Sequence, residues 1–192
     1  MRHRIFIAIN LPENIKKELV DFQSKWPELP VRWVKIENLH ITLVFLGYLN
    51  DEELVEVLKI TKEVASGHEP FSINLIKVCY GPPKKMPPRM IWVEGEKSTE
   101  LGKLQNNLEN SLFSTPIKNL KEPGARPYAP HITLGRMRQW EFRQIEPEER
   151  PVVNEDISLS FQVNSIEVME SQLKRGGSEY TILESCQLKE SM

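Results

Sequence analysis

Short apolar runs separated by polar turns recur along the chain, and this pattern is typical of β-strands. In Phe71 to Tyr80 apolar and polar residues alternate, as expected for a strand that packs one face against a core. The pattern predicts strands over Arg4 to Ile9, Val31 to Val34, His40 to Leu46, Phe71 to Tyr80, Met90 to Val93, His131 to Leu134, Ile157 to Val163, Ser165 to Gln172 and Ser178 to Leu188. A tight connection at Lys174 to Gly177 predicts that the last two strands form a hairpin.

Three segments instead repeat apolar residues every three or four positions, which is the spacing of one helix face. Pro12 opens the first helix, which is expected to continue to Trp26, and Asn50 with Asp51 caps the second. The apolar positions are Ile15, Leu19, Phe22 and Trp26, then Leu54, Val57, Leu58, Val64 and Ala65, then Leu101, Leu104, Leu108 and Leu112. The charged segment Arg138 to Arg150 fits either a short helix or a loop.

The tetrapeptide His-Ile-Thr-Leu occurs twice, at His40–Leu43 and at His131–Leu134. Because alternate residues of a strand face the same way, each copy would present an imidazole and a hydroxyl together and bury its Ile and Leu. A single copy is explained by ordinary strand preferences, but the repetition favours a paired-histidine acid–base site. One histidine would take a proton from a nucleophile and the other would protonate a leaving oxygen, which is enough to open a phosphodiester without a metal. The other two histidines, His3 and His68, fall outside the repeat.

The elements around the two motifs also repeat in order. A strand at Ile5, a helix to Trp26 and the motif at His40 correspond to a strand at Ile91, a helix to Phe113 and the motif at His131. Two copies of such length indicate pseudo-symmetry rather than a solenoid. The chain of 192 residues is therefore expected to form a two-lobed fold that brings the motifs face to face.

Composition limits the partners and the setting of the protein. A net charge of -2 excludes the broad basic surface that grips long duplex nucleic acid, so any nucleic-acid contact should be local. Cys79 and Cys186 make no disulfide framework, which favours a cytoplasmic location. The N-terminal apolar run Ile5 to Ile9 is too short for a signal peptide or a membrane span. Neither motif has the ligand spacing of a zinc site, and no metal is expected.

Several segments resemble the two-histidine phosphoesterase superfamily, and within it the RNA 2',3'-cyclic phosphodiesterases, also called 2'-5' RNA ligases. These segments are Arg4 to Ile9, Arg32 to Val34, Asn38 to Gly47, Pro88 to Trp92, Pro130 to Arg136 and Ser171 to Leu173, with Gly177 and Tyr180 beyond. The resemblance covers essentially the whole chain, residues 1–192, as a single bilobal phosphoesterase domain. It implies a pseudo-symmetric α+β fold in which antiparallel sheets line a central cleft with helices packed outside, and it implies no cofactor.

The resemblance also implies a reaction, the hydrolysis of an RNA-terminal 2',3'-cyclic phosphate to a 2'-phosphomonoester. His40 would be the proton donor to the leaving 3' oxygen and His131 the proton acceptor from water. Thr42 and Thr133 would each place a hydroxyl on a non-bridging phosphate oxygen. Run backwards with a 5'-hydroxyl RNA end, the same groups would form a 2'-5' linkage.

Two alternatives remain open at this stage. One is a cyclic phosphodiesterase for small molecules, such as a nucleoside 2',3'-cyclic phosphate or ADP-ribose cyclic phosphate. The other is a non-catalytic module that only binds RNA ends. The expected partner is RNA with a cyclic phosphate end, for which tRNA fragments are one candidate source, and nothing in the sequence demands more than a monomer.

Arg136 is the expected additional phosphate ligand. Strict alternation would place it on the face opposite His131, so this role requires a β-bulge at Gly135 that re-aims the next side chain. Without the bulge, Arg136 would make a surface ion pair.

Further binding residues are expected around the motifs. Lys84, Lys85 and Arg89 form a basic loop among prolines that could guide the RNA backbone, or could simply be solvated. Tyr128 is a candidate for stacking on a terminal base. Core packing is favoured for the aromatic residues Phe45 and Trp33.

Overall fold

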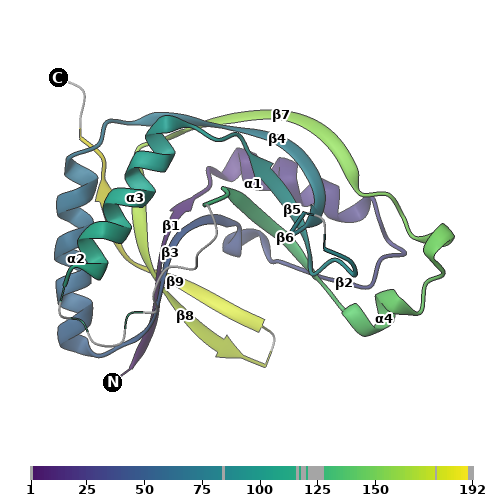
Figure 1. Cartoon of the computed structure of the whole chain (residues 1–192), viewed down its shortest axis with the longest axis horizontal. Helices are drawn as coiled ribbons and strands as arrows, with labels where there is room; N and C mark the ends of the chain where they lie inside the picture. Colours follow the sequence, from purple (N-terminus) through teal and green to yellow (C-terminus); the bar gives the residue numbers. More distant parts are fainter. Residues whose placement is uncertain are drawn as a thin grey trace.

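The computed structural model describes residues 2–83, 85–115, 117, 120, 128–175 and 177–189 (Figure 1). It confirms an α+β fold, with a nine-stranded antiparallel sheet and four α-helices within those ranges. The strands are β1 His3–Asn10, β2 Val31–Trp33, β3 His40–Leu49, β4 Phe71–Gly81, β5 Met90–Gly95, β6 His131–Met137, β7 Asn154–Val163, β8 Ser165–Lys174 and β9 Gly177–Gln187. The helices are α1 Glu13–Asp21, α2 Asp51–Ser66, α3 Thr99–Phe113 and α4 Gln139–Arg143, with 3-10 turns at Phe22–Ser24, Ile36–Asn38 and Pro147–Glu149.

The strand order is β7-β4-β5-β6-β3-β1-β8-β9, and it divides into two matching halves between β6 and β3. In one half β1 pairs with β3, and in the other β5 pairs with β6, as the internal repeat predicts. The halves meet at a single backbone pair, Ile41 with Ile132, and β2 pairs with β6 off the main path. The two expected antiparallel sheets are therefore joined at their adjoining edges.

The two faces of the central strands are clearly different. Ile41, Leu43, Ile132 and Leu134 are buried in the main core, together with apolar residues of α1, α2 and α3. Helices α2 and α3 lie side by side and pack against β3 (Figure 1). The alternating His and Thr residues of both motifs are only partly buried and lie on the other face. The helices therefore cover one side of the sheet and leave the polar side of the motifs uncovered by this core.

Local capping confirms the predicted start of α2. The Asn50 side chain accepts a hydrogen bond from the Glu53 backbone (2.8 Å), and the Glu53 carboxylate accepts one from the Asn50 backbone (2.9 Å). This reciprocal capping box satisfies donors that the first helical turn leaves free.

Several predicted boundaries are wrong, and among them β6 continues past Leu134 to Met137 and β7 begins at Asn154 rather than Ile157. Strand β3 continues past Gly47 to Leu49, because glycine adopts the φ of +83° that keeps the strand paired with β1. Helix α1 ends at Asp21 rather than near Trp26. A 3-10 turn follows, and in it the Gln23 amide donates to the Val34 carbonyl (2.9 Å), which ties the helix end to the β2 segment.

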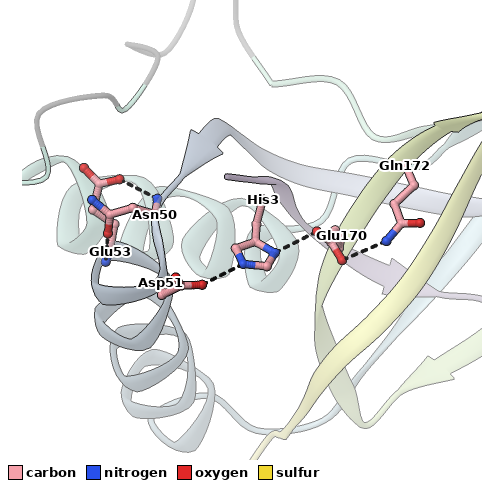
Figure 2. Close-up of polar contacts among 6 residues, drawn as sticks. All are labelled: His3, Asn50, Asp51, Glu53, Glu170 and Gln172. Atoms are coloured by element: carbon pink, nitrogen blue, oxygen red, sulfur yellow. Dashed lines mark hydrogen bonds and ion pairs between the residues drawn. The ribbon is translucent and has the colours of Figure 1, made fainter. Parts of the chain in front are cut away.

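His3 links three elements at the start of the chain, as Figure 2 shows. Its Nδ1 lies 2.8 Å from Glu170 Oε1 on β8, and its Nε2 lies 2.9 Å from Asp51 Oδ1 at the start of α2. Gln172 donates to the other Glu170 oxygen at 3.3 Å. The hydrogen bonds with Asp51 and then with Glu170 raise the pKa of His3, because they favour the charged ring. When it is protonated, the imidazole can donate to both carboxylates and so link β1, β8 and α2.

We expect His3→Gln to lower the thermal unfolding midpoint by about 2 °C near pH 6. A raised folded-state pKa gives stability that is fully present below the ordinary pKa of 6.5 and is lost as pH rises through the folded pKa. The difference between wild type and variant should therefore shrink toward pH 9, measured by circular dichroism. His68→Gln is the matched control. Burial lowers the pKa of His68, so the neutral ring is favoured in the folded state. The destabilisation caused by His68→Gln should therefore grow as the pH rises. A pH-independent difference for His3→Gln would contradict the assignment.

Candidate active site

The two motifs, His40–Leu43 and His131–Leu134, lie side by side at the centre of the sheet. The pair formed by Ile41 and Ile132 joins equivalent residues of the two copies on antiparallel strands. In each motif the Ile is flanked by His on one side and Thr on the other. Both of these side chains lie on the face opposite the core. The fold therefore brings together the four side chains that the sequence singles out, related by a local two-fold axis.

Both imidazoles are held in the same way. His40 Nδ1 lies 2.7 Å from the Asn38 carbonyl, and His131 Nδ1 lies 2.9 Å from the Ala129 carbonyl. A carbonyl only accepts, so each Nδ1 carries hydrogen and each neutral ring presents an unprotonated Nε2. The Thr42 hydroxyl lies 3.0 Å from His40 Nε2. Each ring can therefore exchange a proton through Nε2 while its orientation stays fixed.

The two imidazole rings contact different aromatic side chains. His40 lies 5.0 Å from Phe6 and 5.2 Å from Tyr180, measured between ring centroids. His131 stacks on Trp92, with centroids 3.9 Å apart. The sequence analysis did not predict these aromatic contacts. Only Phe6 could have been found, because it is an apolar residue that alternates out of phase with the core residues of β1.

Burial first, and then nearby positive charge, lower the pKa of His40 to about 4. The cations are Arg136 and Lys16, joined by His131 when its ring is protonated, while the hydrogen bond to Asn38 acts in the opposite direction. At neutral pH the free protein therefore holds His40 uncharged within a cationic neighbourhood, which favours an anionic ligand.

The pKa of His131 is also lowered by burial. Its hydrogen bond to Ala129 and the negative charge of Glu94 oppose this effect. The two equivalent rings thus differ in their electrostatic surroundings, because a carboxylate acts on His131 and cations act on His40.

A β-bulge re-aims Arg136, as its expected role requires. Against β5, Gly135 pairs with Ile91 and Thr133 pairs with Trp92, which leaves Leu134 as the extra residue. Arg136 then shares a face with Thr133, and both lie near the Met90 sulfur, at 3.9 Å and 3.7 Å. The bulge is confirmed, and phosphate binding by Arg136 stays a prediction.

Strand β3 carries a matching bulge. Against β1, Thr42 pairs with Ala8 and Val44 pairs with Ile7, so Leu43 is the extra residue. Phe45 thereby occupies the place that corresponds to Arg136 in the other half. It is 58% exposed, so the expectation that it packs in the core is wrong. The bulge turns its ring out to the polar face.

The remaining predicted residues lie at several places around the motifs. Tyr128 is half-buried, and its hydroxyl donates to the Thr42 carbonyl (3.2 Å). Arg89 is exposed, and its carbonyl accepts from the Met137 backbone (2.9 Å) beside the end of β6. Lys85 is exposed in the same loop, and Lys84 lies outside the described residues. Substrate contacts by these residues stay predictions.

Potential metal ligands and thiols elsewhere in the described part of the chain do not form a second reactive site. No cluster of three or more His, Cys, Asp or Glu side chains there could hold a metal ion. Cys79 and Cys186 are both free, and burial raises their thiol pKa values to about 12 and about 11. These thiols are therefore protonated at neutral pH. No helix in the same ranges is long and apolar enough to cross a membrane.

Comparison with known proteins identifies the family of the chain. Residues 9–92, which include the first motif, match the model described as LigT like phosphoesterase. A Thermus thermophilus protein named RNA 2',3'-cyclic phosphodiesterase is 30% identical, over 97% of this chain and 90% of its own length. The chain belongs to the LigT-like phosphoesterase family. A relative of the same name from Methanocaldococcus jannaschii is 29% identical, over 94% of this chain and 98% of its own.

Solved structures of similar proteins extend the match to the whole fold. A crystal structure of a Thermus thermophilus protein superposes with a TM-score of 0.83, at 28% identity, and covers 97% of this chain and 98% of that one. E. coli LigT complexed with 3'-AMP gives a TM-score of 0.77 at 25% identity, with coverage of 99% and 100%. The similarity therefore includes both halves of the sheet, beyond the region matched by the family model.

We expect Arg136→Gln to raise the pKa of His40 from its value of about 4, by about half a pH unit at low ionic strength. The variant removes a positive charge that disfavours the protonated ring. An NMR titration of the histidine ring signals measures the change. Arg138→Gln is the control, because Arg138 already pairs with Glu141 at 3.2 Å. An unchanged His40 titration in Arg136→Gln would show that the two groups do not interact.

Proposed function

We propose that this LigT-like phosphoesterase is an RNA 2',3'-cyclic phosphodiesterase that converts a terminal cyclic phosphate to a 2'-phosphomonoester. The observation that carries the proposal is the pair of imidazole–hydroxyl sets on adjoining strands, each with its Nε2 directed away from the backbone acceptor. The names of the relatives at 29% and 30% identity support the choice of substrate.

In the proposed reaction, water attacks phosphorus in line with the bond to the 3' oxygen. His131 Nε2 takes a proton from the water, and His40 Nε2 gives a proton to the departing 3' oxygen, so the ring opens with no net change in protons. Thr42 and Thr133 donate hydrogen bonds to the non-bridging oxygens, where negative charge grows. Arg136 balances the charge of the phosphate.

His40 must be protonated to act as the proton donor, although its pKa is lowered in the free protein. In the free protein the cations around His40 oppose its protonation, whereas Glu94 favours a proton on His131. A phosphodiester anion next to His40 offsets the cations and raises its pKa. Substrate binding thus prepares the proton donor, and the pH profile of kcat, which reports the enzyme–substrate complex, should be bell-shaped.

A small cyclic nucleotide is the second candidate substrate, because the same four side chains would act on any 2',3'-cyclic phosphate. The complex of E. coli LigT with the mononucleotide 3'-AMP supports this second candidate. Reversal of the reaction with a 5'-hydroxyl RNA end would give 2'-5' ligation, since both directions share one transition state. A module that only binds RNA ends would give no product in any of these assays.

We expect His40→Ala and His131→Ala each to lower kcat by about 10²- to 10⁴-fold on an RNA oligomer with a 2',3'-cyclic phosphate end, because each removes one proton-transfer group. The assay includes EDTA, and phosphorus NMR maps the product phosphate to the 2' or 3' position. His68→Gln, far from the motifs in sequence and bonded to Asn107 (3.0 Å), serves as the control and should keep the wild-type rate. A wild-type rate in either Ala variant would refute the proposed site.

We expect Thr42→Val and Thr133→Val to lower kcat by about 10²-fold while preserving side-chain shape, because each removes one donor to the phosphate. Thr42→Val should also alter the titration of His40, since the two side chains are 3.0 Å apart. Steady-state kinetics and the same ring titration measure both effects. If only KM changed, the hydroxyls would act in ground-state binding and not on the developing charge.

A further inference from the structure

Arg32 lies directly opposite Arg136 on the neighbouring strand. In the antiparallel pairing of β2 with β6, Arg32 pairs with Arg136 and Trp33 pairs with Gly135. Opposed residues of antiparallel strands point to the same side, with Cβ atoms about 4.5–5.5 Å apart. A Cβ added to Gly135 would lie 2.3 Å from Val31 and 2.8 Å from Trp33, so those side chains fill the other face. Arg32 is therefore on the face of the sheet that carries the two motifs.

The two arginines are placed together without a carboxylate between them. Like charges directly across a strand pair are destabilising, and proteins normally separate them or neutralise them. Among the described residues, the ion pairs include neither Arg32 nor Arg136, and Glu179 on β9 is paired with Lys174. An anion bound on this face would relieve the repulsion.

The guanidinium of Arg32 reaches toward the start of β9. A Cβ added to Gly177 would lie 2.6 Å from Arg32 Nη2, so the guanidinium lies against the Gly177 backbone. The next carbonyl, that of Ser178, accepts from Asn38 Nδ2 at 2.8 Å, and the Asn38 carbonyl orients His40. Arg32 is thus connected through β9 to the His40 side of the site, while Arg136 adjoins Thr133 on β6.

We propose that Arg32 binds the phosphodiester that precedes the cyclic phosphate, so that it makes the enzyme prefer an oligonucleotide end to a mononucleotide. This inference rests on the proposed function. Arg136 holds the terminal phosphate, and Arg32 beside it holds the next anion along the same strand. Guanidinium is suited to this task because its donors form a planar fork that matches phosphate oxygens.

The test compares two substrates that differ by one phosphodiester, a nucleoside 2',3'-cyclic phosphate and a dinucleotide with the same cyclic end. Arg32→Gln should lower kcat/KM on the dinucleotide by about tenfold to a hundredfold, the usual effect of losing a hydrogen bond to a charged group. On the mononucleotide it should change kcat/KM by less than about twofold. The salt dependence on the dinucleotide should also weaken, by about 0.7 in the logarithmic slope for one lost contact to a single strand.

Controls separate charge, folding and position. Arg32→Lys should retain most of the salt slope, and Arg138→Gln should behave as wild type, because Arg138 is an exposed arginine already paired with Glu141. The mononucleotide rate of Arg32→Gln reports whether the variant folds and whether its active site is intact. An equal loss on both substrates, or no loss on the dinucleotide, would overturn the assignment.

Hydrolysis by the wild-type protein tests the proposed function, and dinucleotide binding tests the role of Arg32 separately. If the wild-type protein hydrolyses neither substrate, the proposed function fails. Calorimetric binding of a dinucleotide with a plain 3'-phosphate end then tests Arg32 alone. Weaker binding by Arg32→Gln, by a similar factor, supports the subsite, and unchanged affinity overturns it.

Discussion

The backbone pair between Ile41 and Ile132 is the constraint on which the candidate site depends. It joins equivalent residues of the two motifs, so it sets the register of one motif against the other. A shift of one residue in either strand would turn its imidazole into the core and expose its isoleucine. The burial of Ile41 and Ile132 among the helices therefore fixes where the histidines lie. Packing on one face of the sheet determines chemistry on the other.

The same arrangement places two neutral rings beside fixed positive charge. Burial disfavours charge on both imidazoles, and the charges of Arg136 and Lys16 make a proton on His40 still less favourable. Positive charge is thus supplied by groups that do not transfer protons, while the groups that do transfer protons stay close to neutrality. Separating these tasks keeps the two histidines free to change protonation state.

Features that depend on neighbouring residues could be predicted from the sequence. Features that depend on the register between distant strands could not. The repeated motif, the strand periodicity, the Asn50 cap and the bulge next to Gly135 are visible in the sequence, because each depends on residues close together in the chain. The opposition of Arg32 and Arg136 and the His3 link between β1, β8 and α2 are not visible, because each depends on pairing between distant segments. Phe45 was misassigned because its exposure follows from the bulge in β3, which has no glycine to mark it.

The two bulges have one further consequence. Each strand gains its extra residue at the same leucine of the motif, so both halves turn one more side chain toward the shared face. In one half that side chain is the cationic Arg136, and in the other it is the aromatic Phe45. A symmetric frame alone would accept a ligand in either of two orientations. With a guanidinium at one end and a flat apolar ring at the other, the two ends of the face differ, and a ligand would be expected to bind in one orientation.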